Sequence, residues 1–135
     1  MRILVLCTGN SCRSQMVEGL LKSMFPTWEI FSAGTKPTGF VHPLAIKSLK
    51  EIGIDISHYQ SKSIHQFLDQ SWDYVITVCA DANNSCPVFI GAVKKRVHLG
   101  FPDPALTLGS ENQKPTRFNS LRDEMLIRLR NTFNP

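Results

Sequence analysis

The feature that most constrains the fold is an alternation between short apolar segments and longer amphipathic ones. Apolar runs of strand length occupy 3–6, 28–31, 74–78 and 94–99. Apolar residues recur at helical spacing at 14–25, 43–52, 116–133 and, more weakly, 63–70, whereas 80–91 has the composition of a loop. Strands that alternate with helices pair in parallel through right-handed crossovers. The sequence therefore predicts an α/β fold, a four-stranded parallel sheet with helices on both faces in a Rossmann-like three-layer arrangement.

Length and composition fit one domain, assigned to 1–135. The chain has 135 residues, of which 42% are hydrophobic and 19% charged, and such a chain buries a core without disulfide staples. Its net charge of +4 favours small anions but is too diffuse to indicate nucleic acid. No apolar run is long enough to span a membrane. The apolar start, MRILVLC, is too short for the hydrophobic region of a signal peptide. We expect a cytoplasmic monomer without membrane or nucleic-acid partners.

An octapeptide between the first predicted strand and the first predicted helix has the character of an anion-binding loop. It consists of Cys7, Thr8, Gly9, Asn10, Ser11, Cys12, Arg13 and Ser14. A helix N-terminus attracts negative charge, and Gly9 and Asn10 suit the positive φ angles of an anion nest. Arg13 would fork two donors onto an oxyanion, and these donors with Ser14 would stabilise a thiolate at Cys7. The structural alternative is a buried cysteine beside a surface arginine.

Two further chemical groups follow strand ends. In parallel sheets, ligands bind beyond the carboxyl ends of the strands, so Cys7, Cys79 and the 100–104 loop are expected to meet on one rim. Asp103 precedes a proline that favours an extended backbone, and its carboxyl group would protonate a leaving oxygen. The alternative for Asp103 is an ordinary Asp-Pro turn.

The cysteines indicate redox chemistry rather than a metal site. In a reducing compartment, cysteines are more often catalytic or metal-binding than structural. Cys79 and Cys86 are separated by six residues, which is not the paired spacing of a zinc knuckle, and the histidines form no ligand pattern. We therefore predict no metal site. A nucleophile with two further thiols would form a disulfide relay, and the alternative is two incidental buried thiols.

The whole chain resembles the thioredoxin-coupled arsenate reductases, which share the fold of the low-molecular-weight protein tyrosine phosphatases. The matching stretches are CTGNSCRSQMVEG at 7–19, FSAG at 31–34, ITVCADANNSCPVF at 76–89, HLGFPDPA at 98–105 and FNSLRDEM at 118–125. The combination of anion loop, two downstream cysteines and Asp-Pro is far more specific than any one part.

The resemblance implies a role for each cysteine. Cys7 would be the nucleophile, and Arg13 with the loop amides would bind arsenate, for which phosphate and sulfate are analogues. Cys79 would attack the Cys7–arsenate adduct and release arsenite. Cys86 would then take over the disulfide and present it to thioredoxin. Cys12 would take no part in this chemistry, although it would be able to pair with Cys7 under oxidation.

One position departs from the family pattern. Some members hold a potassium ion behind the anion loop with an Asn, a Glu, a Ser and an Asp. The first three match Asn10, Glu18 and Ser32, but the Asp position holds Lys62. A lysine ammonium would repel potassium and replace its charge, which speaks against potassium dependence. The alternative for Glu18 is an ordinary carboxylate on a helix surface.

Other functions remain open at this point. A low-molecular-weight phosphatase would use the anion loop and Asp103 as the acid, but it usually carries a tyrosine where this chain has Ala105. It would also have no use for Cys79 and Cys86. A non-catalytic oxyanion-binding or redox-sensing module would not need Asp103. Glutathione with glutaredoxin remains an alternative electron donor, and weak phosphatase activity is compatible with each enzyme.

Overall fold

The computed structural model describes residues 1–85, 88–105 and 111–133. Its centre is a four-stranded parallel sheet in the order β2-β1-β3-β4. The strands are β1 (Arg2–Cys7), β2 (Glu29–Gly34), β3 (Trp72–Thr77) and β4 (Val93–His98). The predicted parallel α/β sheet is confirmed, and the carboxyl ends of β1 and β3 lie side by side because Leu6 is paired with Thr77.

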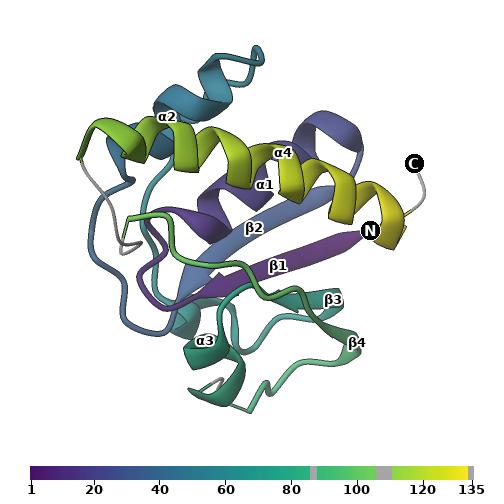
Figure 1. The fold of residues 1–135 in the computed structure, drawn as a ribbon. Coiled ribbons are helices and arrows are strands. Elements are labelled where there is room, and N and C mark those ends of the chain that lie inside the picture. The colour runs from purple at the N-terminus through teal and green to yellow at the C-terminus, as the bar shows by residue number, and fades with distance from the viewer. Residues whose placement is uncertain (86–87, 106–110, 134–135) are drawn as a thin grey trace.

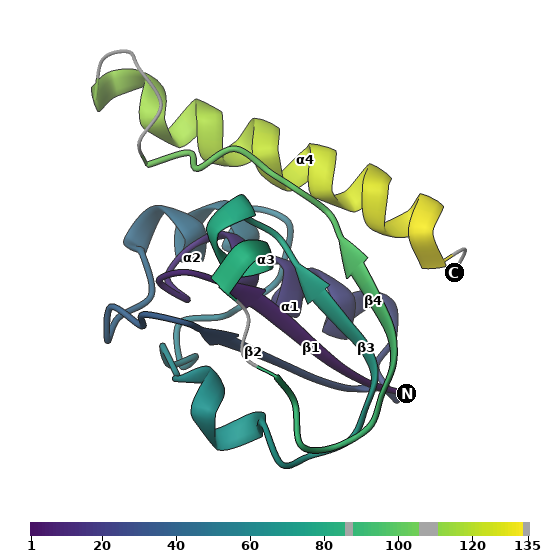
Figure 2. The same cartoon turned by 90° about the horizontal axis from the view of Figure 1, so that it is seen from below.

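Helices cover both faces of this sheet. The longer helices are α1 (Arg13–Met24), α2 (Pro43–Lys50) and α4 (Lys114–Phe133), and they lie on one side (Figure 1). The short helix α3 (Ala80–Ser85) lies on the other side, in front of the strands in Figure 2. The described residues also form two 3₁₀ turns, η1 (Ile64–Phe67) and η2 (Glu111–Gln113). No helix in the described part of the chain is long and apolar enough to cross a membrane.

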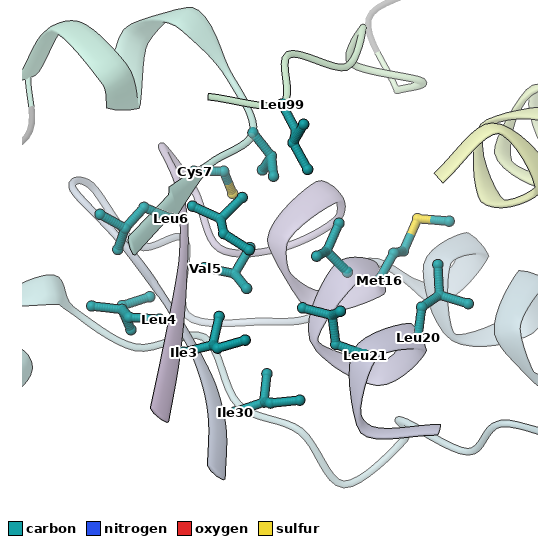
Figure 3. Packing of buried hydrophobic residues seen from close by; sticks show 14 of the residues in the cluster. Ile3, Leu4, Val5, Leu6, Cys7, Met16, Leu20, Leu21, Ile30 and Leu99 are labelled. Atoms are coloured by element: carbon teal, nitrogen blue, oxygen red, sulfur yellow. The ribbon is translucent and has the colours of Figure 1, made fainter. Parts of the chain in front are cut away.

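The core explains why the first strand is almost wholly apolar. Ile3 and Val5 point toward α1, and Leu4 and Leu6 point to the opposite face of the sheet (Figure 3). All four are completely buried, as expected for a central strand covered on both faces. Burying each such side chain contributes about 1.5–3 kcal/mol. This anchoring fixes the position of Cys7, the last residue of the strand.

The C-terminal helix buries the stripe that its periodicity predicts. Phe118, Leu121, Met125 and Leu129 are buried. The ring of Phe133 meets Tyr74 of β3 edge-on, with centroids 5.2 Å apart. The stripe therefore attaches α4 along one side of the fold.

Two expectations about helices are wrong. The segment 80–91, expected to be a loop, begins with the helix α3 (Ala80–Ser85). The helix expected over 63–70 is only the 3₁₀ turn η1 (Ile64–Phe67). At the start of this turn, the His65 N–H donates to Ser63 Oγ. At the start of α3, the Ala82 N–H donates to the Cys79 sulfur at 3.4 Å.

Candidate active site

The octapeptide forms the connection between the buried strand β1 and helix α1. Cys12 occupies the N-cap position of α1, and no side chain in the described structure caps that end of the helix. The first turn also contains no acidic residue. The first amides of a helix have no partner within it, and the helix dipole places partial positive charge at this end. The loop therefore ends at a position that favours an anion.

The backbone of the loop is only partly as expected. Asn10 adopts a positive φ of 50°, as predicted. The same expectation for Gly9 is wrong, because Gly9 is not among the described residues with positive φ. Its constraint is steric, since a Cβ atom at Gly9 would lie 3.0 Å from Thr38 Cγ2. The contact at Gly34 is tighter than that at Gly9, because a Cβ atom at Gly34 would lie 2.5 Å from the carbonyl oxygen of Thr8.

Backbone hydrogen bonds attach the loop to the segment that follows β2. The Lys36 N–H donates to Thr8 O at 2.9 Å, and the Thr38 N–H donates to Gly9 O at 2.9 Å. In a third bond, the His42 N–H donates to the carbonyl oxygen of Ser11 at 2.8 Å. These hydrogen bonds hold the loop in place before a ligand binds. The loop donors therefore need little reorganisation on binding.

The sulfur of Cys7 is buried and surrounded by donors. The Asn10 N–H donates to Cys7 Sγ at 3.2 Å, and Ser14 Oγ lies 2.9 Å from the same sulfur. Asn10 Nδ2 also donates to Ser14 Oγ at 2.7 Å. Ser14 therefore accepts from Asn10 and has its own proton free to donate to Cys7. A sulfur that accepts two hydrogen bonds is in a suitable environment for a thiolate nucleophile.

The predicted acid and the predicted anion ligand line the same cavity as Cys7. The cavity has a volume of about 260 Å³ and is lined by Cys7, Thr8, Gly9, Ser11, Cys12, Arg13, Thr38 and Asp103. Arg13 Nη1 donates to Phe101 O at 3.2 Å, and Arg13 Nη2 lies 3.7 Å from Asp103 Oδ2. The Ala105 N–H donates to Asp103 Oδ1 at 3.0 Å, which fixes the carboxylate at the cavity edge. The fold thus brings Cys7, Arg13 and Asp103 together.

The second thiol lies next to the loop. Cys79 follows β3, is 4% exposed, and has its sulfur 3.4 Å from Thr8 Oγ1. Thr8 comes directly after Cys7, so the predicted meeting of the two strand ends is confirmed. Cys86, the third thiol of the predicted relay, lies outside the described residues.

Cys12 differs from Cys7 in its surroundings. Burial raises the pKa of Cys12 from 9.0 to about 11, with opposing effects from the Ser11 hydrogen bond and smaller effects from nearby charges, including Asp103. A thiol with this pKa is protonated at neutral pH. Cys12 is therefore a poor nucleophile, which agrees with its expected lack of a chemical role.

The raised pKa of Cys12 predicts a loss of stability in alkali. Folding favours the protonated thiol, so this contribution to stability is complete below pH 9 and is lost as the pH rises toward 11. Between pH 8 and 10.5, the free energy of unfolding should fall by about 1–2 kcal/mol less in Cys12→Ala than in the unchanged protein. Urea unfolding of both proteins under reducing conditions measures this difference. Equal falls in both proteins would contradict the prediction.

A row of polar side chains lies behind the loop. Asn10 Nδ2 donates to Ser32 Oγ at 3.0 Å, and Ser32 Oγ donates to Glu18 Oε1 at 2.6 Å. Glu18 is 4% exposed, so the interpretation as a surface carboxylate is wrong. Lys22 Nζ lies 2.8 Å from Glu18 Oε2. The oxygens that a potassium ion would need are therefore already engaged by hydrogen-bond donors.

Lys62 contributes to this row through its backbone as well as its charge. Its N–H donates to Asn10 Oδ1 at 2.8 Å, and its ammonium donates to Gln60 O at 2.9 Å. Burial lowers the pKa of Lys62, an effect opposed by the charge of Glu18 and reinforced by that of Lys22. Two ammonium groups near one carboxylate are a poor environment for a further cation.

The fold and this site define the class of protein. The chain belongs to the low molecular weight phosphotyrosine protein phosphatase family, whose model matches residues 2–131. Within it, the chain is 46% identical to the arsenate reductase of Halalkalibacterium halodurans over 129 residues, which cover 95% of this chain and 91% of that protein. It is 45% identical to the arsenate reductase of Bacillus subtilis, with the same coverage.

A solved structure agrees with these relatives. An arsenate reductase in its phosphate-binding state superposes with a TM-score of 0.80 at 31% identity, covering 97% of this chain and 95% of that one. The predicted resemblance to arsenate reductases with the low-molecular-weight phosphatase fold is therefore confirmed.

Sequence reasoning missed three residues around the site. Lys22 was detectable, because it follows Glu18 by four residues and such pairs face each other on a helix. Gln15 is completely buried and donates to Asn10 Oδ1 at 2.9 Å, but its position alone does not separate it from a surface polar residue. Thr38 lines the cavity from a loop that is distant in sequence, and no motif marks it.

Proposed function

We propose that this chain reduces arsenate to arsenite with a relay of Cys7, Cys79 and Cys86, and that thioredoxin restores the thiols. One observation carries the proposal: a second buried thiol, Cys79, contacts the anion loop through Thr8 at 3.4 Å. Hydrolysis of a phosphoester needs only the nucleophile, the anion ligand and the acid. A second thiol at the loop is needed when the bound oxyanion must accept electrons.

The first step would form an adduct. Arg13 and the loop amides bind arsenate, and the Cys7 thiolate attacks arsenic to form a sulfur–arsenic bond. One arsenic–oxygen bond breaks, and its oxygen leaves as water with a proton from Asp103. The short distance between Arg13 and Asp103, 3.7 Å, supports the placing of acid and anion ligand around one substrate. Arsenic remains pentavalent at this stage.

The second step would transfer the electrons. The Cys79 thiolate attacks the sulfur of Cys7, a disulfide forms, and the electron pair of the sulfur–arsenic bond passes to arsenic, which leaves as arsenite. Two thiols are thus oxidised while arsenic gains two electrons. Cys86 then attacks Cys79 and frees Cys7, and the dithiol of thioredoxin reduces the Cys79–Cys86 disulfide. The cycle ends with the three thiols restored.

Phosphatase activity is the less favoured function. Both reactions would use Cys7, Arg13 and Asp103. The position after Asp-Pro holds Ala105, a small and partly buried residue packed against the core, where the phosphatases usually carry a tyrosine to help hold an aromatic ester. Slow hydrolysis of small esters is expected as a side activity, because phosphate and arsenate are similar in shape and charge.

A coupled assay tests the proposal and its electron donor. Arsenate should drive NADPH oxidation in the presence of thioredoxin and thioredoxin reductase, and much less in a parallel reaction with glutathione, glutaredoxin and glutathione reductase. Omitting arsenate is the control for background oxidation. Turnover only with glutaredoxin would replace thioredoxin as the donor. Ester hydrolysis without arsenate reduction in either system would favour the phosphatase.

A further inference from the structure

The outer half of a hydrogen-bond chain begins at the partly exposed ammonium of Lys22. Its Nζ donates to Glu18 Oε2 at 2.8 Å, one turn earlier on α1. The Glu18 side chain is only 5% exposed, and its other oxygen accepts from Ser32 Oγ of β2 at 2.6 Å. A buried carboxylate is costly unless it is paired and hydrogen-bonded. Lys22 supplies the charge and Ser32 the second hydrogen bond.

The pKa of Lys22 agrees with this pairing. Burial lowers the pKa of Lys22, but the hydrogen bond and the charge of Glu18 outweigh burial and raise it above its ordinary value. Lys62 also attracts Glu18 electrostatically, but its ammonium donates to Gln60 O instead. Lys22 is therefore the direct cationic partner of Glu18 in the structure.

The inner half of the chain leads from Ser32 to the nucleophile. Asn10 Nδ2 donates both to Ser32 Oγ at 3.0 Å and to Ser14 Oγ at 2.7 Å. Asn10 Oδ1 accepts from Gln15 Nε2 at 2.9 Å, which fixes which end of the amide faces the two hydroxyl groups. Ser14 Oγ lies 2.9 Å from Cys7 Sγ.

The two halves have a single consistent direction. Glu18 accepts from Ser32, so Ser32 must accept from Asn10. The second N–H of the same amide donates to Ser14, which leaves the Ser14 proton available for Cys7. A thiolate at Cys7 can only accept, so in that state the Ser14 hydroxyl donates to the sulfur. The charge on Glu18 thus helps to determine which group donates to the Cys7 sulfur, and that charge depends on Lys22.

From this chain we infer that Lys22 is a positioning residue for Cys7: it holds the Glu18 carboxylate so that Ser32, Asn10 and Ser14 keep the nucleophilic sulfur supplied with donors. The inference rests on the proposed role of Cys7 in the reaction. In this inference, the Lys22 ammonium group takes the place of a bound cation beside the Glu18 carboxylate. Without Lys22, the buried carboxylate would turn toward solvent or take up a proton, and Ser32 would lose its charged acceptor.

The test is the rate at which iodoacetamide alkylates Cys7 at pH 7, followed by mass spectrometry of digests of the reduced protein. Lys22→Met should lower the rate constant about tenfold, and Lys22→Arg should keep it near that of the unchanged protein. Lys47→Met is the matched control, because Lys47 is exposed on α2 and its loss changes the net charge equally. An unchanged rate in Lys22→Met, or an equal loss in Lys47→Met, would overturn the inference.

A second variant separates positioning from a general loss of structure. Glu18→Gln should lower the alkylation rate as Lys22→Met does, and the double variant should be no slower than the slower single variant, because both changes break one chain. Independent, multiplying losses would overturn the inference. The rate in the unchanged protein should also be equal in potassium and sodium at equal ionic strength, and acceleration by potassium would contradict it. Alkylation requires no arsenate turnover, so failure of the proposed function is detected separately by the coupled assay.

Discussion

Cys7→Ser is expected to lower both arsenite formation and ester hydrolysis by roughly 10³-fold or more. Serine keeps the shape of the side chain but replaces a thiol with an alcohol, which is far less ionised near neutral pH. The donors from Asn10 and Ser14 would still surround the oxygen, so binding of phosphate or sulfate should be nearly retained. Arsenate-dependent NADPH oxidation, p-nitrophenyl phosphate hydrolysis and phosphate binding by calorimetry measure the three quantities.

Cys12→Ser is the matched control for this substitution. It makes the same chemical change five residues further along the loop, at a thiol that is protonated at neutral pH because burial raises its pKa to about 11. This variant should keep most of both activities. Arsenate reduction near the native rate in Cys7→Ser would show that Cys7 is not the nucleophile. Complete loss of reduction in Cys12→Ser with the fold intact would contradict the prediction as well.

The second large effect concerns the relay, because it separates reduction from hydrolysis. Cys79→Ser should release no arsenite in a single turnover while ester hydrolysis continues, since only reduction needs a second thiol. Cys86→Ser should release one arsenite per protein and then stop with a Cys7–Cys79 disulfide. Alkylation after arsenate treatment, followed by mass spectrometry of digests, identifies the protected thiols. Normal turnover of Cys79→Ser with thioredoxin would rule out the relay.

Most of the fold follows from patterns that packing enforces. The strand from Ile3 to Leu6 is apolar on both faces because both faces are covered. The stripe from Phe118 to Leu129 lies on one side of α4 because that side faces the core. Helix α3 was missed because its six residues, ADANNS, contain no apolar period and are rich in residues that favour turns. Its start is capped by a cysteine sulfur, which is not a usual capping group.

The site was predictable where a local motif places residues and less so where the fold brings distant ones together. Cys7 and Arg13 are fixed by one strand–loop–helix connection, and Asp103 and Cys79 were placed by the rule that parallel strands end on one rim. Thr38 reaches the cavity through hydrogen bonds between its segment and Gly9, which no sequence pattern reveals. The positive φ expected at Gly9 was wrong because a close approach, rather than an unusual torsion, constrains that residue.

In the proposed relay, the contact between the Cys79 sulfur and the Ala82 N–H would determine the order of the steps. The sulfur accepts from the Ala82 N–H at 3.4 Å at the start of α3, where a helix has N–H groups without partners inside it. In the proposed reaction, bonding to Cys7 would draw that sulfur away from the amide, and a helix of six residues has little other stability of its own. Oxidation of Cys79 would thus destabilise α3, the segment that precedes Cys86 in the sequence. The helix–coil equilibrium of α3 would then be linked to the redox state of Cys79, which in the proposed reaction changes only when the arsenic is reduced.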